Sequence, residues 1–118
     1  MVLKLNWMRC VGDQWCNLIQ LNLTHPHFDN LEGVYIIWHG APNPSVVYIG
    51  QGVIRDRLNE HRDDPQVLKY KSHTLFVTWA FVQKVYRDGV ERFLAEKWKP
   101  KMGASFPNVE PIEVNSPW

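Results

Sequence analysis

Long apolar runs and cysteines are both scarce in this chain of 118 residues. The longest apolar run, LFVTWAFV at 75–82, is far too short to cross a bilayer as a helix. The N-terminus, MVLKLNWMRC, lacks the uninterrupted apolar stretch of a signal peptide. Internal repeats and low-complexity segments are absent as well. We therefore expect one soluble, cytoplasmic domain with a single core and no membrane partner.

With only two cysteines, the sequence offers little sulfur chemistry. In a cytosolic chain, Cys10 and Cys16 are expected to be buried thiols and not a disulfide. Together with His25 and His27 they could supply four zinc ligands, but the C-x5-C spacing is not that of a common zinc finger. A zinc site at these residues is therefore not favoured.

The net charge of +1 is unevenly distributed along the chain. Residues 55–101 carry eleven basic and seven acidic side chains, whereas residues 1–54 carry two and three. A basic middle segment suits a partner that bears phosphates. It is equally explained by two solvated helix faces rich in lysine and arginine, so charge alone leaves both interpretations open.

Periodicity predicts a small α+β domain in which helices pack against a largely antiparallel sheet. The N-terminal segment 15–23 has strand-like content, and DDPQ (63–66) separates the first helix from a further turn. The three main strands are expected at 33–38, 45–50 and 73–86. The two helices are expected at about 52–62 and at 87–99, where Pro100 stops the second one.

The first expected helix turns two polar side chains toward its apolar side. Its apolar arc consists of Val53, Ile54 and Leu58. At 100° per residue, Arg57 and His61 fall inside that arc, one turn apart. Arg55 and Arg62 fall on the opposite side and are expected to point into solvent.

The second expected helix repeats this pattern with a carboxylate. Glu91 lies in the middle of the apolar stripe, whereas Glu96 lies on the polar side. The stripe consists of Val90, Leu94, Ala95 and Trp98. A carboxylate in such a stripe costs several kcal/mol unless it is paired or binds a metal. One explanation is a structural salt bridge from Glu91 to Arg57, with His61 as a satisfied, half-buried residue.

Two strand tyrosines, Tyr35 and Tyr48, extend this set and favour a second explanation. A carboxylate can hold a divalent cation that acts as a Lewis acid on a phosphate. An arginine can neutralise the charge that develops on phosphorus, and a phenol or imidazole can take the proton from an attacking water. An arginine, a histidine, a carboxylate and two phenols on one face therefore suit phosphoryl chemistry.

These residues resemble the GIY-YIG endonucleases. Gly33-Val34-Tyr35 and Tyr48-Ile49-Gly50 match the two halves of the family motif. IRDRLNEHR (54–62) matches the helix with its arginine and histidine, and ERFLAEKWKP (91–100) matches the helix with its glutamate and following proline. The resemblance covers about residues 33 to 103.

The resemblance implies a three-stranded antiparallel sheet flanked by helices and the hydrolysis of DNA phosphodiester bonds with one divalent metal, Mg²⁺ or Mn²⁺. Tyr35 would be the base or the phenol that orients water, with Tyr48 as its hydrogen-bonding companion. Arg57 would stabilise the transition state, His61 would assist proton transfer, and Glu91 would bind the metal. The basic residues expected on DNA phosphates are Arg55, Arg62, Lys69 and Lys71.

The same resemblance divides the chain into three segments. Residues 1–32 form an N-terminal extension, a strand and cap packed on the domain. Residues 33–103 form the nuclease-like domain, and residues 104–118 form a C-terminal tail. The family often has an asparagine shortly after the proline, where this chain has Gly103. Most members also carry a separate DNA-recognition domain, so a recognition protein or a homo-oligomer is an expected partner.

Two functions are therefore predicted. The first is a metal-dependent endonuclease that acts on structured or nicked DNA. The second is a catalytically weak domain of the same fold that binds DNA or a protein partner. The complete set of five site residues favours the first, and Gly103 favours the second.

Overall fold

The computed structural model of the chain describes residues 2–40, 43–102 and 106–118. In chain order the regular elements are β1 (Val2–Leu3), β2 (Cys16–Asn17), β3 (Glu32–His39), β4 (Ser45–Val53), α1 (Ile54–Arg62), α2 (Pro65–Leu68), β5 (Leu75–Phe81), α3 (Lys84–Trp98) and β6 (Glu113–Val114). Short 3-10 turns lie at Val11–Asp13, Pro26–Phe28 and Lys71–His73. Within the described ranges, no helix has both the length and the apolar character needed to span a membrane.

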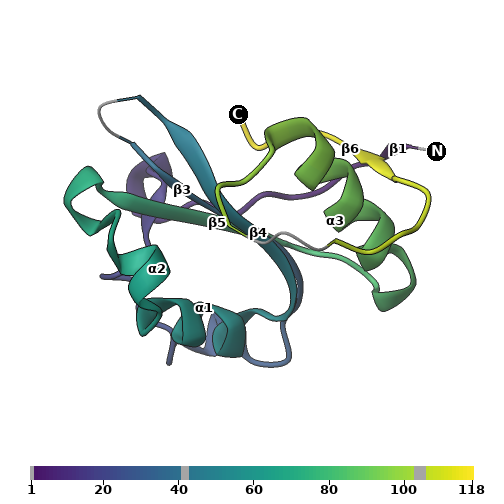
Figure 1. Cartoon of the computed structure of the whole chain (residues 1–118). Coiled ribbons are helices and arrows are strands. Elements are labelled where there is room, and N and C mark those ends of the chain that lie inside the picture. The colour runs from purple at the N-terminus through teal and green to yellow at the C-terminus, as the bar shows by residue number, and fades with distance from the viewer. Residues whose placement is uncertain (1, 41–42, 103–105) are drawn as a thin grey trace.

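An antiparallel sheet with the strand order β2-β5-β3-β4 forms the centre of the molecule (Figure 1). The three long strands confirm the antiparallel sheet expected from the sequence, and β2 adds a short fourth strand. In the register of β3, Tyr35 lies opposite Gly50 of β4 and opposite Trp79 of β5. β3 has a strand on each side, and every residue from Gly33 to His39 is buried.

Helices cover both faces of this sheet, with α1 and α3 on opposite sides (Figure 1). Alternate residues of β3 therefore contribute to two separate cores. Tyr35 and Ile37 belong to the core beneath α1, and Val34 and Ile36 belong to the core beneath α3. Covering on both faces explains why this strand is apolar at nearly every position.

Two strand predictions were too long. The segment 15–23 contains only β2, because the side chain of Asn17 accepts hydrogen bonds from the backbone N–H groups of Ile19 and Gln20 and so turns the chain. The strand predicted at 73–86 ends at Phe81, and α3 begins at Lys84, one turn earlier than expected. Apolar content alone cannot distinguish the end of a buried strand from the first turn of the helix that follows.

The two ends of the chain lie side by side. β1 pairs in parallel with β6, a short strand within the segment that the sequence analysis described only as a C-terminal tail. Asn115 reinforces this pairing, since its side chain accepts from the Leu5 N–H at 2.6 Å and donates to the Leu5 carbonyl at 3.0 Å.

The cysteine prediction was wrong. Cys10 and Cys16 form a disulfide that closes a short loop just before and within β2. Because both sulfur atoms are in this bond, neither cysteine is a thiolate that could bind zinc together with His25 and His27. Disulfides persist mainly in oxidising environments, so this pairing lends no support to the expected cytoplasmic location.

Candidate active site

Tyr35, Tyr48 and His61 form an aromatic cluster between the sheet and α1. The phenol oxygen of Tyr35 lies 2.7 Å from Nε2 of His61, which is a buried hydrogen bond. The Tyr48 ring is stacked on that of Tyr35 with centroids 6.1 Å apart, and its centroid lies 4.3 Å from that of His61. His61 thus lies on the inner face of α1, as the helical periodicity predicted. It, and not Tyr48, is the hydrogen-bonding companion of Tyr35.

Both glycines of the motif are required by close packing. A Cβ atom on Gly50 would lie 2.6 Å from Cζ of Tyr35 and would also overlap its phenol oxygen. A Cβ atom on Gly33 would overlap the carbonyl oxygen of Ala80 in the neighbouring strand. Gly50 therefore makes room for the phenol of Tyr35, and Gly33 allows β3 and β5 to approach each other.

Arg57 does not point into the core, contrary to the helical projection. Its side chain is 45% exposed, and its guanidinium donates to Glu60 at 2.8 Å. The ion pair thus joins two residues of the same helix, and among the described residues the predicted salt bridge from Arg57 to Glu91 is not formed. The stem of Arg57 lies over Gly52, whose φ of +129° brings the strand close to the helix. Val53, expected in the apolar arc, is 40% exposed, because it precedes the helix.

Glu91 does lie on the buried face of α3, as predicted, with only 8% of its surface exposed, whereas Glu96 is exposed. Burial raises the pKa of the Glu91 carboxyl group, hydrogen bonding by Gln51 lowers it, and the nearby Asp88 raises it further. The side-chain amide of Gln51 also donates to Asp88 at 2.7 Å. Gln51 and Asp88 are therefore site residues that the sequence analysis missed. Asp88 precedes Glu91 by three residues, so helical spacing could have identified it.

Electrostatics link Glu91 and Arg57 to both tyrosines although the helices lie on opposite faces of the sheet. Burial is the main cause that raises the pKa of Tyr35 and of Tyr48. For both phenols, the charge of Glu91 raises the pKa and the charge of Arg57 lowers it. Gln51 and Gly52, near the end of β4, connect the two helices: Gln51 hydrogen-bonds to the α3 carboxylates, and the stem of Arg57 lies near Gly52.

The protonation states of the cluster follow from its burial. Burial lowers the pKa of His61, with Asp64 and Glu60 acting in the opposite direction. At neutral pH the imidazole is therefore neutral, and so is each phenol, since both phenol pKa values are raised. Tyr35 is 1% exposed, whereas Tyr48 is only partly buried, so Tyr48 is the phenol that solvent can reach.

The carboxylate oxygens of Glu91 and of the nearby Asp88 are suitable ligands for a hard divalent cation. Mg²⁺ prefers oxygen ligands, keeps several waters, and is commonly held by one or two carboxylates. Glu91 is a buried carboxylate that has no ion pair among the described residues, and Asp88 adds a second negative charge close to it. No group of three or more acidic, histidine or cysteine side chains gathers within the described ranges, so protein ligands there would be few.

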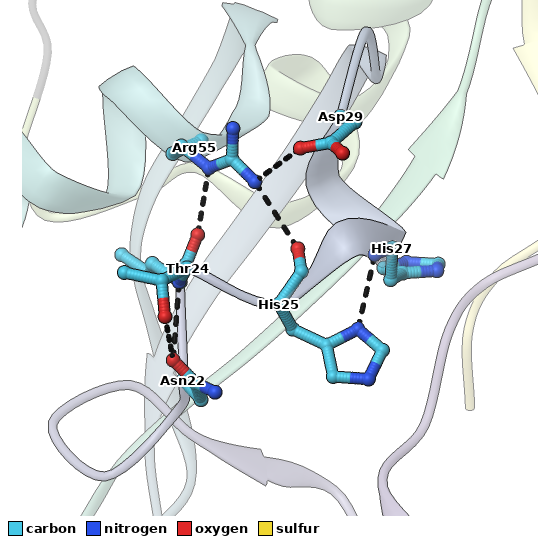
Figure 2. A network of polar contacts seen from close by, with 7 residues as sticks. Asn22, Thr24, His25, His27, Asp29 and Arg55 are labelled. Carbon is cyan, nitrogen blue, oxygen red and sulfur yellow. Dashed lines mark hydrogen bonds and ion pairs between the residues drawn. The ribbon is translucent and has the colours of Figure 1, made fainter.

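Two of the four residues expected to contact DNA are engaged elsewhere. Arg55 donates to the carbonyls of Leu23 and His25 and forms an ion pair with Asp29 at 2.8 Å (Figure 2). Arg62 donates to the carbonyl oxygens of Leu18 and Leu21. The prediction that both point into solvent was wrong, because the N-terminal extension lies over that side of α1.

Lys69 and Lys71 are exposed, at the end of α2 and in the turn after it. They remain available for a phosphate contact. The substitution of the family asparagine by Gly103 lies outside the described residues. Searches of protein-family models, of curated proteins and of solved structures found no match for this chain.

Proposed function

We propose that this chain is a metal-dependent endonuclease of the GIY-YIG type that hydrolyses DNA phosphodiester bonds. The observation that carries the proposal is the buried Tyr35–His61 hydrogen bond, with Tyr48 packed against the imidazole and with Arg57 and Glu91 in electrostatic range of both phenols. A purely structural cluster does not need a desolvated carboxylate without an ion pair beside a neutral imidazole and an exposed arginine whose only ion pair is with a neighbour on its own helix.

In this proposal, the phenols have different tasks. Tyr35 holds the imidazole of His61 in place, since its own hydroxyl is enclosed by Gly50 and the ring of His61. Tyr48 faces solvent beside that imidazole and orients the attacking water. It can take the proton of that water only as its own phenol proton passes to the neutral imidazole of His61. This exchanges the roles that the resemblance gave to the two tyrosines.

The two charged groups act on the phosphate. Arg57 is exposed and can leave its partner Glu60 to neutralise the charge that develops in the transition state. Glu91, with Asp88 beside it, would hold Mg²⁺ or Mn²⁺, which supplies Lewis-acid activation of the phosphate and lowers the pKa of nearby hydroxyl groups. The raised pKa of Glu91 supports this assignment, because a bound cation would compensate the buried negative charge.

The substrate in this proposal is structured or nicked DNA, and a recognition protein or a second copy of the chain supplies further contacts. Two observations favour the alternative of a DNA- or protein-binding module with weak catalysis. The raised pKa of Tyr35 and its 1% exposure oppose proton transfer by that phenol, and the two arginines on the far side of α1 are used to fix the N-terminal extension.

A cleavage assay separates the two functions. Wild-type protein is incubated with nicked, branched and intact duplex DNA, with Mg²⁺, with Mn²⁺ and with a chelator. Single-turnover cleavage is then measured for Tyr48→Phe and Arg57→Ala, with Tyr86→Phe as a control because that tyrosine lies in the other core. We expect the first two variants to lose cleavage by at least tenfold while the control cleaves at the wild-type rate.

Absence of cleavage by the wild-type protein under every metal condition would reject the enzyme. DNA binding retained in that case would support the alternative module. Equal losses in Tyr86→Phe and Tyr48→Phe would show that the effect is structural and would remove Tyr48 from the proposed site.

A further inference from the structure

Four tryptophans surround a cavity near the end of the β3–β4 hairpin, away from the Tyr35–His61 cluster. The cavity measures about 400 Å³ and is lined by Trp15, Trp38, Trp98 and Trp118, together with Pro44, Ser45 and Val46. This volume is in the range of small-molecule sites, about 300 to 1,000 Å³. The residues come from four separate parts of the chain, so the fold alone assembles the cavity.

The tryptophan rings are arranged at steep angles and do not fill the space between them. Trp118 lies 4.7 Å from Trp38, 5.2 Å from Trp98 and 6.0 Å from Trp15, measured between ring centroids. Trp38 is 7% exposed and forms a buried wall, whereas Trp118 is 47% exposed and lies at the rim.

Basic side chains lie beside two of the four rings of the cavity. The segment 97–101 contains Lys97, Lys99 and Lys101 and no acidic residue. The ammonium of Lys97 lies 5.4 Å from the Trp98 ring, and the backbone N–H of Lys101 donates to the carbonyl of Val46 in the cavity wall. The guanidinium of Arg9 lies 4.2 Å from the Trp15 ring and is also paired with Asp13 at 3.3 Å.

The basic groups at the cavity determine whether a cationic or an uncharged ligand suits the aromatic rings. A cage of aromatic rings also attracts quaternary ammonium groups, such as methylated lysine. Here, however, Arg9 and Lys97 already lie over two of the rings, so they would repel a cationic ligand. A planar, uncharged group attached to phosphates fits both features, because aromatic side chains stack on bases and lysines neutralise the phosphates.

We propose that the tryptophan cavity binds an unpaired nucleobase of single-stranded DNA, with Lys97, Lys99 and Lys101 on the adjacent phosphates. Trp98 follows Glu91 by seven residues on α3, which places the cavity about 10 Å along the helix from the proposed metal ligand. In its link to cleavage this inference rests on the proposed function: the substrate would contain an unpaired base a few nucleotides from the scissile phosphate. Base binding itself requires no catalysis.

The test is a binding measurement in the presence of a chelator. The probes are an eight-nucleotide oligothymidylate, an abasic oligonucleotide of the same length and a trimethyl-lysine peptide. Binding of each probe is measured by tryptophan fluorescence and by calorimetry. We expect the oligothymidylate to bind at least tenfold more tightly than the abasic strand, since loss of one stacked base costs roughly this much or more. Trp118→Ala should weaken oligothymidylate binding about tenfold and leave abasic binding unchanged.

Phe81→Ala is the matched control, because Phe81 is 62% exposed and lies at the other end of β5. Equal affinity for the abasic and the thymidylate strands in the wild-type protein would overturn the proposal without the use of any variant. Tighter binding of the trimethyl-lysine peptide than of the oligothymidylate would overturn it in favour of a protein partner. Base-dependent binding without any cleavage would reject the nuclease and leave this site standing. Cleavage without base-dependent binding would overturn the proposed base-binding site and leave the proposed nuclease standing.

Discussion

Replacement of Gly50 by alanine tests the packing that places Tyr35. The backbone of Gly50 adopts no positive φ, so alanine is compatible with the strand there. The added methyl group would nevertheless overlap the phenol oxygen of Tyr35 and lie 2.6 Å from Cζ and 3.0 Å from Cε1. Because the phenol is fixed by His61 and is almost fully buried, it cannot move aside without loss of its hydrogen bond.

The expected cost can be worked out from these contacts. Overpacking a well-packed core costs about 1–3 kcal/mol. Loss of a buried hydrogen bond adds about 1 kcal/mol. Gly50→Ala should therefore lower the free energy of unfolding by about 2–4 kcal/mol, which corresponds to roughly 8–16 °C in Tm for a domain of this size.

The assay is urea unfolding of Gly50→Ala, with Gly40→Ala as a control. A methyl group on Gly40 would meet the tip of the Phe76 ring at 2.7 Å, and that side chain is only partly buried and can turn away. We expect the control to lose less than about 1 kcal/mol. The cost of Gly50→Ala should also shrink in a Tyr35→Phe background, because one of the overlapping atoms is then absent. Wild-type stability of Gly50→Ala, or full additivity of the two substitutions, would refute the placement of Tyr35 against Gly50.

Three further predictions concern groups away from Gly50. Because burial raises the pKa of Glu91, the folded state holds the proton more tightly than the unfolded state, and stability is lost as pH rises from about 4.5. Glu91→Gln should therefore be more stable than wild type at pH 7 but not at pH 4, and equal urea midpoints at pH 7 would contradict this. Arg62→Ala should speed proteolysis within the N-terminal extension, whereas Arg57→Ala should not, and identical digestion of the two variants would count against the anchoring role. Reduction of the Cys10–Cys16 bond should lower the free energy of unfolding by roughly 2 kcal/mol, given its short loop, and an unchanged melting curve in reductant would argue against the disulfide.

Local periodicity was sufficient for the central part of the fold. Continuous apolar runs bounded by turn residues predicted β3 and β4 closely, helical periodicity predicted α1, and the helical spacing of α3 placed Glu91 on its buried face. These predictions succeeded because each depends on which side of one element faces the core, and hydrophobic burial fixes that side strongly.

The fate of the arginines on α1 depended on neighbours that are distant in sequence. The helical projection identified His61 as buried, but it placed Arg57 inward and Arg55 and Arg62 in solvent. The structure shows the opposite for these three, because residues 18–29 cover the outer side of α1 and offer it carbonyl oxygens. A long arginine side chain can satisfy several carbonyls at once, and the sequence holds no local signal of their presence.

The sequence by itself determined the three main strands, the helices α1 and α3 and the burial of His61 and Glu91, because hydrophobic period and turn chemistry are local properties. Only the tertiary structure decided that Tyr35 pairs with His61, that Gln51 and Asp88 accompany Glu91, and that four tryptophans from separate segments enclose one cavity. Such pairings depend on the register between β3 and β4 and on the packing of helices on opposite faces of the sheet. They arise from contacts between residues far apart in the chain, and periodicity within one element carries no information about them.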